Sequence, residues 1–378
     1  MKLILLIFLL FISSIINVKA REIFITSIDS TFRNRLLLNP NTTFISCDDS
    51  INCATVISNF LDKFTNLYCI VFFKTSDGGN RWECVSMDCS RWEYDGYINE
   101  YKYYQITNTG SFFYFSKTDE IIRSFNNGQI GKSSNWGITW TIEKDTIFDN
   151  YEIEDLKLVL LDSGKTLGYN QSPINGKGTG YARIFISNKD FRNWRNIPID
   201  DTLNIQTIYS IFNFQDKYYL LNESLQDHYF HFYFTKTTDN GKNWTSYQLK
   251  LDSGRIHTSS MFFLNDSIGW IIGNYIKNGK SNISVFYTSD CGNSWDIISD
   301  FFSDIIHKYL FFYNKDEGVM LSSNMGFITN DGGKTWEKLT YHNNEAFPYP
   351  IKMLVSTRKN EFLCITNDGI IFKLIITN

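Results

Sequence analysis

The residues best suited to bind a partner are aromatic and cationic side chains in segments that lack the alternating pattern of a strand. Aromatic rings on loops favour contact with a sugar, a peptide or another protein, and a guanidinium fork suits a carboxylate. The stretch 90–97 places three such rings beside an arginine. The sequence therefore predicts a recognition surface. Its candidate residues are Arg91, Trp92, Tyr94, Tyr97, Arg255 and His257.

A second group of candidate functional residues consists of five carboxylates in the segment 145–155. Clustered carboxylate oxygens are the ligands that calcium prefers, so this segment could hold calcium or meet a basic partner, and the alternative is a solvated charged loop. Apart from this calcium ion, no cofactor or metal is expected, because the five histidines do not lie beside the cysteines at the spacing of zinc ligands and no CxxC is present. The carboxylates are Asp145, Asp149, Glu152, Glu154 and Asp155.

The sequence contains none of the common catalytic motifs. It has no HExxH pair and no nucleophilic triad signature, and the glycine-rich segment 176–180 lacks the strand-to-helix context that phosphate binding requires. The charge is nearly balanced, with Lys+Arg 36 against Asp+Glu 40 and a net charge of −4. Such a surface offers no broad attraction for phosphate backbones, so we expect no nucleic-acid partner.

The cysteines indicate an oxidising compartment without fixing their connectivity. There are seven, so at least one has no partner within the chain. Cys47 with Cys53, and Cys84 with Cys89, could each close a small loop. The alternative for the remaining cysteines is that they are buried thiols packed as small apolar groups.

The N-terminus has the form of a secretory signal peptide. Lys2 precedes the apolar run Leu3–Ile12, and Val18–Ala20 has the small-x-small pattern of a cleavage site. The run is short for a membrane-spanning helix, which makes an anchor the less favoured alternative. We expect residues 1–20 to be removed and residues 21–378 to form the mature protein, outside the cell or in a periplasm.

The composition favours strands over helices. The chain has 22 Tyr, 32 Phe and 9 Trp but only four Ala. Alanine is the best helix former, whereas aromatic side chains fit a pleated sheet.

A repeated pattern organises these strands: Ser or Thr, any residue, Asp, any residue, Gly, two residues, and Trp. The six Trp residues are 58, 54, 50, 51 and 41 residues apart, and alternating or aromatic-rich runs lie on either side of each copy. Each copy is predicted to be a tight hairpin turn, with Gly at positive φ, the carboxylate bonded to turn amides and Trp filling the space between sheets. The third copy, Ser187–Trp194, is degenerate. The pattern residues are Asp77, Gly79, Trp82, Asn135, Gly137, Trp140, Trp194, Asp239, Gly241, Trp244, Asp290, Gly292, Trp295, Asp331, Gly333 and Trp336.

These turns resemble the Asp-box, or bacterial neuraminidase repeat, over most of the mature chain. The family places the box between the third and fourth strands of a propeller blade, so the resemblance implies an all-β β-propeller in which the boxes are structural and lie away from the binding face. A last blade from Glu361 to Thr377 lacks a fourth strand, and Arg21–Thr26 could supply it and close the ring. We predict seven blades, with six or eight as alternatives. In such a ring, Trp92 could instead cap the central channel or pack against the first blade.

The resemblance leaves two functional classes open. Sialidases with these boxes use three converging arginines, a tyrosine activated by a glutamate, and an aspartic acid; here Arg91 and Arg255 fall on the predicted binding face without a third arginine. The segments Ile268–Gly273 and Gly326–Trp336 are more similar to single seven-bladed propellers of the photosystem II assembly and stability factor type, which are non-catalytic scaffolds. We therefore predict a secreted, monomeric binding propeller for a protein or a glycan, with a sialidase-like exo-glycoside hydrolase as the alternative.

Overall fold

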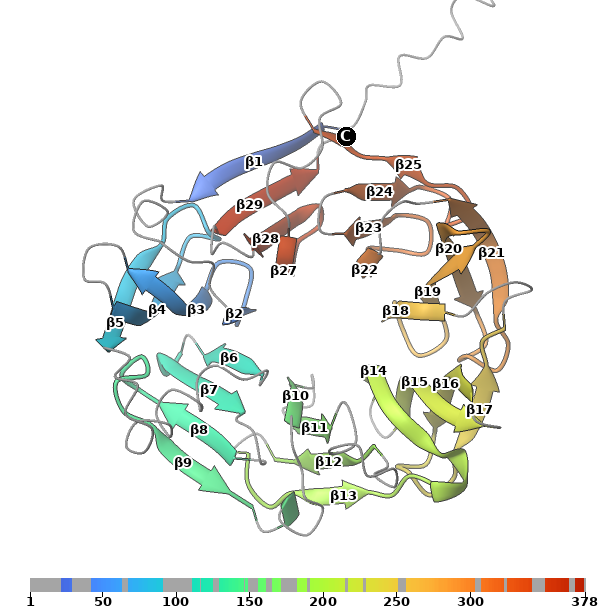
Figure 1. The fold of residues 1–378 in the computed structure, drawn as a ribbon, viewed down its shortest axis with the longest axis horizontal. Coiled ribbons are helices and arrows are strands. Elements are labelled where there is room, and N and C mark those ends of the chain that lie inside the picture. Colours follow the sequence, from blue (N-terminus) through green and yellow to red (C-terminus); the bar gives the residue numbers. More distant parts are fainter. Residues whose placement is uncertain are drawn as a thin grey trace, which may run out of the picture.

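The structure, a computed structural model, is all-β, and its strands form a ring of sheets (Figure 1). It describes residues 22–28, 42–62, 67–90, 111–115, 117–124, 129–145, 147–148, 156–160, 165–170, 182–188, 191–214, 217–226, 229–250, 256–302, 307–322, 325–341, 351–366 and 371–376. Within these ranges there are seven sheets, six of four strands and one of five. The prediction of seven blades is therefore confirmed, and six or eight are excluded.

The blades follow one another along the chain, and in the first six each strand pairs with the next. Blade 1 contains β2 (Thr42–Cys47), β3 (Cys53–Asp62), β4 (Leu67–Thr75) and β5 (Glu83–Ser90). Blade 2 contains β6 (Phe112–Phe115), β7 (Glu120–Ser124), β8 (Gln129–Ser133) and β9 (Thr141–Lys144). Blade 3 contains β10 (Leu156–Leu160), β11 (Thr166–Asn170), β12 (Ile184–Ser187) and β13 (Arg195–Ile197). The single helical turn η2 (Asp201–Leu203) leads into blade 4.

The second half of the ring repeats this order with longer strands. Blade 4 contains β14 (Ile205–Phe214), β15 (Lys217–Gln226), β16 (Tyr229–Thr237) and β17 (Thr245–Gln248). Blade 5 contains β18 (Ile256–Phe263), β19 (Gly269–Lys277), β20 (Lys280–Thr288) and β21 (Asp296–Phe302). Blade 6 contains β22 (His307–Phe312), β23 (Gly318–Ser322), β24 (Gly326–Thr329) and β25 (Glu337–Lys338). Blade 7 contains β27 (Ile351–Arg358), β28 (Glu361–Thr366) and β29 (Ile371–Ile376), joined by β1 (Glu22–Ile28) and β26 (Thr340–Tyr341).

The second strand of a blade is covered on both faces, because a neighbouring blade lies against each side of its sheet. In β19, every residue from Gly269 to Tyr275 is buried, so this strand is buried continuously rather than on alternate residues. Its Trp270 stacks on Phe312 of blade 6 with ring centroids 3.7 Å apart, and the indole N–H donates to the carbonyl of Gly332 at 2.8 Å. Adjacent blades thus share one apolar core, to which both contribute side chains.

Packing between blade 7 and blade 1 closes the ring. The buried apolar residues form seven clusters, and each cluster joins two adjacent blades. The cluster at the point of closure brings Leu363 and Ile371 of blade 7 against Ile45 and Val71 of blade 1. The ring therefore has no open apolar seam among the described blades.

The N-terminal strand lies along the outer edge of blade 7. β1 runs antiparallel to β29, with Ile23 opposite Ile376 and Ile28 opposite Ile371, and parallel to β26. This is the position that a fourth strand occupies in the other blades. That the N-terminal segment closes the ring stays a prediction, and Arg21 lies outside the described residues.

The cysteine predictions have different outcomes. Cys47 and Cys53 are joined by a disulfide across the hairpin of β2 and β3. The pairing of Cys84 with Cys89 is wrong, because both residues belong to the extended strand β5. Five residues of strand separate their Cα atoms by roughly 16 Å at about 3.3 Å per residue, well beyond the 4.4–6.8 Å of a disulfide.

Candidate functional site

The repeat turns are the hairpin turns that carry the six pattern tryptophans, and five of them are held by the same set of hydrogen bonds. In blade 5, the Thr288 hydroxyl donates to the Asp290 carboxylate at 2.8 Å, Gly292 N–H donates to the Thr288 oxygen at 2.9 Å, and Ser294 N–H donates to the carboxylate at 3.0 Å. The same three contacts recur in blades 1, 2, 4 and 6, around Asp77, Asn135, Asp239 and Asp331. The four carboxylates and one amide oxygen are thus occupied by the backbone.

These hydrogen bonds keep the carboxylates ionised. At Asp239, the donors are the backbone N–H of Asn243, its side-chain amide and the Thr237 hydroxyl, and together they lower the pKa of Asp239 to about 2. A carboxyl group that holds no proton near neutral pH cannot act as a general acid. The turn carboxylates therefore serve the fold.

Each tryptophan of a repeat turn packs in the seam with the preceding blade. Trp295 of blade 5, for example, meets the ring of Phe234 in blade 4 edge-on, with ring centroids 4.9 Å apart. The other five lie in the corresponding seams of their own blades: Trp82, Trp140, Trp194, Trp244 and Trp336.

The degenerate third turn keeps this arrangement with different residues. Phe191 takes the place of Gly and adopts a positive φ of 62°, while its ring is buried in the seam between blades 2 and 3. Asp145 of blade 2 supplies a carboxylate from outside the turn, accepting from Trp194 N–H at 3.2 Å and from Ile147 N–H at 3.0 Å. Asp145 is therefore committed to backbone amides.

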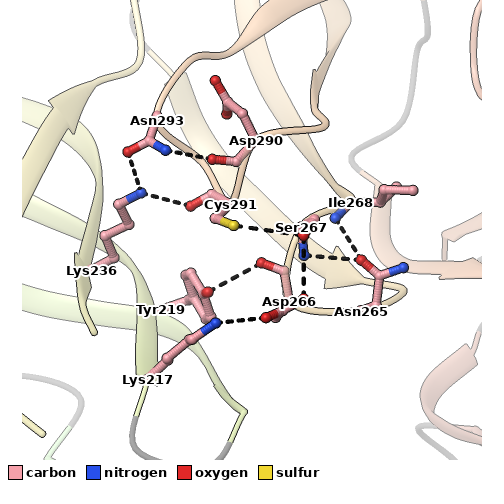
Figure 2. A network of polar contacts seen from close by, with 10 residues as sticks. All are labelled: Lys217, Tyr219, Lys236, Asn265, Asp266, Ser267, Ile268, Asp290, Cys291 and Asn293. Atoms are coloured by element: carbon pink, nitrogen blue, oxygen red, sulfur yellow. Dashed lines mark hydrogen bonds and ion pairs between the residues drawn. The ribbon is translucent and has the colours of Figure 1, made fainter. Parts of the chain in front are cut away.

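A polar network ties the turn sides of blades 4 and 5 together (Figure 2). Lys217 of β15 forms an ion pair with Asp266 at 2.6 Å, and the Tyr219 hydroxyl donates to the Asp266 carbonyl at 3.1 Å. The ammonium group of Lys236 donates to the Cys291 carbonyl at 2.8 Å and to the Asn293 side chain at 2.7 Å. Lys217 and Lys236 of blade 4 are thus both engaged in contacts with blade 5.

Similar ion pairs join other neighbouring blades on the same side of the ring. Lys74 of blade 1 lies 3.4 Å from Asp119 in the β6–β7 turn of blade 2, and Lys359 of blade 7 lies 2.6 Å from Glu317 of blade 6. The repeat turns and the turns between first and second strands share this side, because both follow strands that run in the same direction. We call it the turn face, and its charges hold blades together.

The sequence assigned the predicted binding residues to the opposite face, where the chain passes from one blade to the next. Arg91, Trp92, Tyr94, Tyr97 and Arg255 lie outside the described residues. His257 is the second residue of β18, and its side chain is not described. The recognition surface therefore stays a prediction.

The structure also does not test the predicted calcium site. Asp149, Glu152, Glu154 and Asp155 lie outside the described ranges, and within those ranges no group of three or more His, Cys, Asp or Glu side chains could hold a metal ion. The described residues also include no helix long and apolar enough to cross a membrane.

A tyrosine and a glutamate that sequence reasoning missed come together in blade 4. The Tyr209 hydroxyl donates to the Glu223 carboxylate at 3.1 Å, and the Tyr209 ring stacks on Phe232 with centroids 5.2 Å apart. Glu223 is only 8% exposed. The β14–β15 hairpin brings these residues together, and Tyr209 lies at a register shift between Ile208 and Ser210 of the inner strand. Strand pairing with this bulge cannot be read from spacing alone.

Together, the ring of seven sheets and the seven seams define the chain as a seven-bladed β-propeller with a structural turn face. No protein-family model matches it, and no curated protein matches it.

Among solved structures, the chain is similar to YCF48 bound to a D1 peptide, with a TM-score of 0.57 and 14% identity over 96% of this chain and 97% of that one. It is also similar to YCF48 from Cyanidioschyzon merolae, with a TM-score of 0.56 and 15% identity over 90% and 97%. The polysaccharide lyase Uly1 has a TM-score of 0.51 and 10% identity over 96% and 98%. These likenesses confirm, at the level of the fold, the resemblance to propellers of the photosystem II assembly factor type.

Proposed function

We propose that this chain is a secreted, non-catalytic propeller that binds a protein partner through the face opposite the repeat turns. The observation that carries the proposal is the commitment of the turn face: the repeat-turn carboxylates bond turn amides, and Lys217 and Lys236 bridge blades 4 and 5. We therefore place the binding surface on the opposite face, which bears the connections between blades. The structural likeness to a propeller in complex with a peptide supports a protein rather than a glycan as the partner.

The proposal includes the sequence-based expectations on processing. Residues 1–20 act as a secretory signal, and residues 21–378 form a single monomeric propeller, with the repeat turns as Asp-boxes. The strand β1 closes the ring by serving as the outer strand of blade 7, which the antiparallel pairing with β29 supports. The disulfide between Cys47 and Cys53 supports an oxidising compartment.

The test is a binding screen of purified residues 21–378 against arrays of synthetic peptides and of glycans. We expect capture of a subset of peptides, and loss of that capture in Trp92→Ala. The matched control is Lys334→Ala, which removes an exposed side chain on the turn face. Peptide capture that survives Trp92→Ala but fails in Lys334→Ala would place binding on the wrong face, and capture of glycans alone would reject a protein partner.

The alternative, a sialidase-like glycoside hydrolase, is favoured by one observation, the hydrogen bond between Tyr209 and Glu223. A tyrosine bonded to a carboxylate can act as an activated nucleophile. Turnover of a synthetic sialoside that is abolished in Tyr209→Phe would establish this alternative. The binding proposal expects no turnover by the unsubstituted protein or by Tyr209→Phe.

A further inference from the structure

A β-bulge recurs at the same position in four consecutive blades. In blades 4 to 7, the second residue of the inner strand is skipped in the pairing with the second strand, while the residues on either side of it are paired. The skipped residues are Gln206, His257, Lys308 and Lys352. The corresponding pairs in blades 1 to 3 show no register shift over their described residues.

The topology places these four positions on the proposed binding face. The repeat turn joins the third strand to the fourth, and the inner strand runs in the same direction as the third, so the inner strand ends at the turn face and begins at the opposite one. The bulges lie at these beginnings. The strands that carry them, β14, β18, β22 and β27, line one side of the centre of the ring (Figure 1), and β14 contacts β18, which contacts β22.

Bulges are common next to binding sites and at the rims of barrels, where they redirect one side chain and leave one residue out of the ladder. The same register shift in four successive blades is hard to attribute to chance. In blade 5 the residue of the second strand paired just before the bulge is Tyr275, and in blades 4, 6 and 7 it is small, polar and buried: Ser224, Ser322 and Thr366. These strand ends thus interrupt the apolar core with polar groups.

The residues at the bulges change in character around the ring. Blade 4 has Gln206, whose side-chain amide donates to Asn204 at 2.9 Å. Blades 5, 6 and 7 have His257, Lys308 and Lys352, three cationic or potentially cationic residues in a chain whose net charge is −4. We call these three residues the basic arc. A lysine ammonium is a compact charge on a flexible stem, suited to a carboxylate held at a rim.

We propose that the basic arc binds the carboxylates of an acidic peptide segment of the partner protein. The inference rests on the proposed function, and it adds the chemistry of the ligand to the location of the site. The three positions of the basic arc lie at the beginnings of neighbouring inner strands. They could therefore meet successive Asp or Glu side chains of an extended peptide. Complementary charge of this kind sets specificity and speeds association.

The experiment uses residues 21–378 and a fluorescein-labelled decapeptide that alternates Glu and Ser, with fluorescence polarisation as the readout. The controls are the Gln-for-Glu peptide and the protein variant Lys334→Gln with Lys338→Gln, which removes two exposed lysines from blade 6 outside the arc. The test variant is Lys308→Gln with Lys352→Gln, checked for folding by its urea midpoint. We expect the Glu peptide to bind at least tenfold more weakly to the test variant than to the control variant, and more weakly as salt is raised.

Several results would overturn the inference. Equal affinity of the two variants, equal affinity for the Gln peptide, or no binding of the Glu peptide would each reject the arc as a carboxylate site. Displacement of the peptide by sialyllactose or a hyaluronate oligosaccharide, with the same dependence on the two lysines, would make the ligand an acidic glycan instead. Capture of uncharged peptides in the array screen would uphold the proposed function while the arc failed, so the two failures are distinguishable.

Discussion

The substitution Gly292→Ala tests the seams directly. Gly292 lies in the repeat turn of blade 5 at a φ of 70°, and a Cβ at this position would overlap the Phe234 ring of blade 4. That ring cannot move easily, because Trp295 lies against it with centroids 4.9 Å apart and Tyr219 and Phe263 lie 5.8 Å away on the same measure. The methyl group therefore acts on both the turn and the contact between two blades.

The expected loss is the sum of two separable effects. A side chain at positive φ costs about 1–2 kcal/mol. Forcing an extra carbon into a packed core costs about 1–3 kcal/mol. We therefore expect Gly292→Ala to lower the free energy of unfolding by about 2–5 kcal/mol.

The matched control is Gly279→Ala in the β19–β20 turn. Gly279 has a φ of 73°, and a Cβ there would have nothing within 4 Å, so only the backbone effect remains. Urea unfolding followed by tryptophan fluorescence gives both free energies from midpoint and slope. We expect Gly292→Ala to be the more destabilising by about 1–3 kcal/mol. Equal losses for the two variants would refute the claim that the repeat turns lock adjacent blades.

Three further predictions follow from the contacts and the strand register of the described residues. Lys236→Met removes the donor of two hydrogen bonds to blade 5, of which Asn293 keeps only the longer contact from Tyr247, and we expect urea unfolding to show a loss of about 1–3 kcal/mol. The pKa of Asp239 is lowered from 3.8 to about 2, so its ionised form stabilises the fold above pH 3.8, and this contribution is lost as the pH falls toward 2. We therefore expect the melting temperature to fall less steeply between pH 5 and pH 2 in Asp239→Asn than in the unsubstituted protein. The register pairs Cys69 with Cys89 across β4 and β5, a separation that suits a disulfide, so non-reducing peptide mapping of the secreted protein should recover this bond.

Each of these predictions has a control that would expose an error. Lys242→Met removes an exposed lysine and should leave the urea midpoint unchanged; an equal loss in both lysine variants would contradict the role of the network. Glu337→Gln removes an exposed carboxylate, and an acid profile identical to that of Asp239→Asn would show that the turn bonds are irrelevant. Recovery of Cys89 bonded to Cys84 would contradict the extended course of β5.

The repeat turns were predictable because their signal is local. The hydroxyl, carboxylate and glycine that form such a turn lie within five residues, and the turn conformation favours those residue types. The count of seven blades followed from their spacing and from the partial repeat at the C-terminus. The third turn was harder, since its positive φ falls on Phe191 and its carboxylate comes from Asp145, which is far away in the sequence.

Features that depend on register were not predictable. The bulges at Lys308 and Lys352 arise from how two strands align, and a shift of one residue leaves the local sequence pattern unchanged. The error at Cys84 and Cys89 has the same origin, because a short separation in sequence was taken as a loop where the chain is a strand. The partner of Tyr209 was likewise hidden until the β14–β15 pairing was known.

Hydrogen exchange of residues 21–378 with and without the Glu-Ser peptide tests the central claim most directly. The account predicts slower exchange at the beginnings of β18, β22 and β27 when the peptide is bound, with no change at the repeat turns around Asp239, Asp290 and Asp331. Protection confined to the repeat turns would show that the turn face binds the ligand, and the account would be wrong.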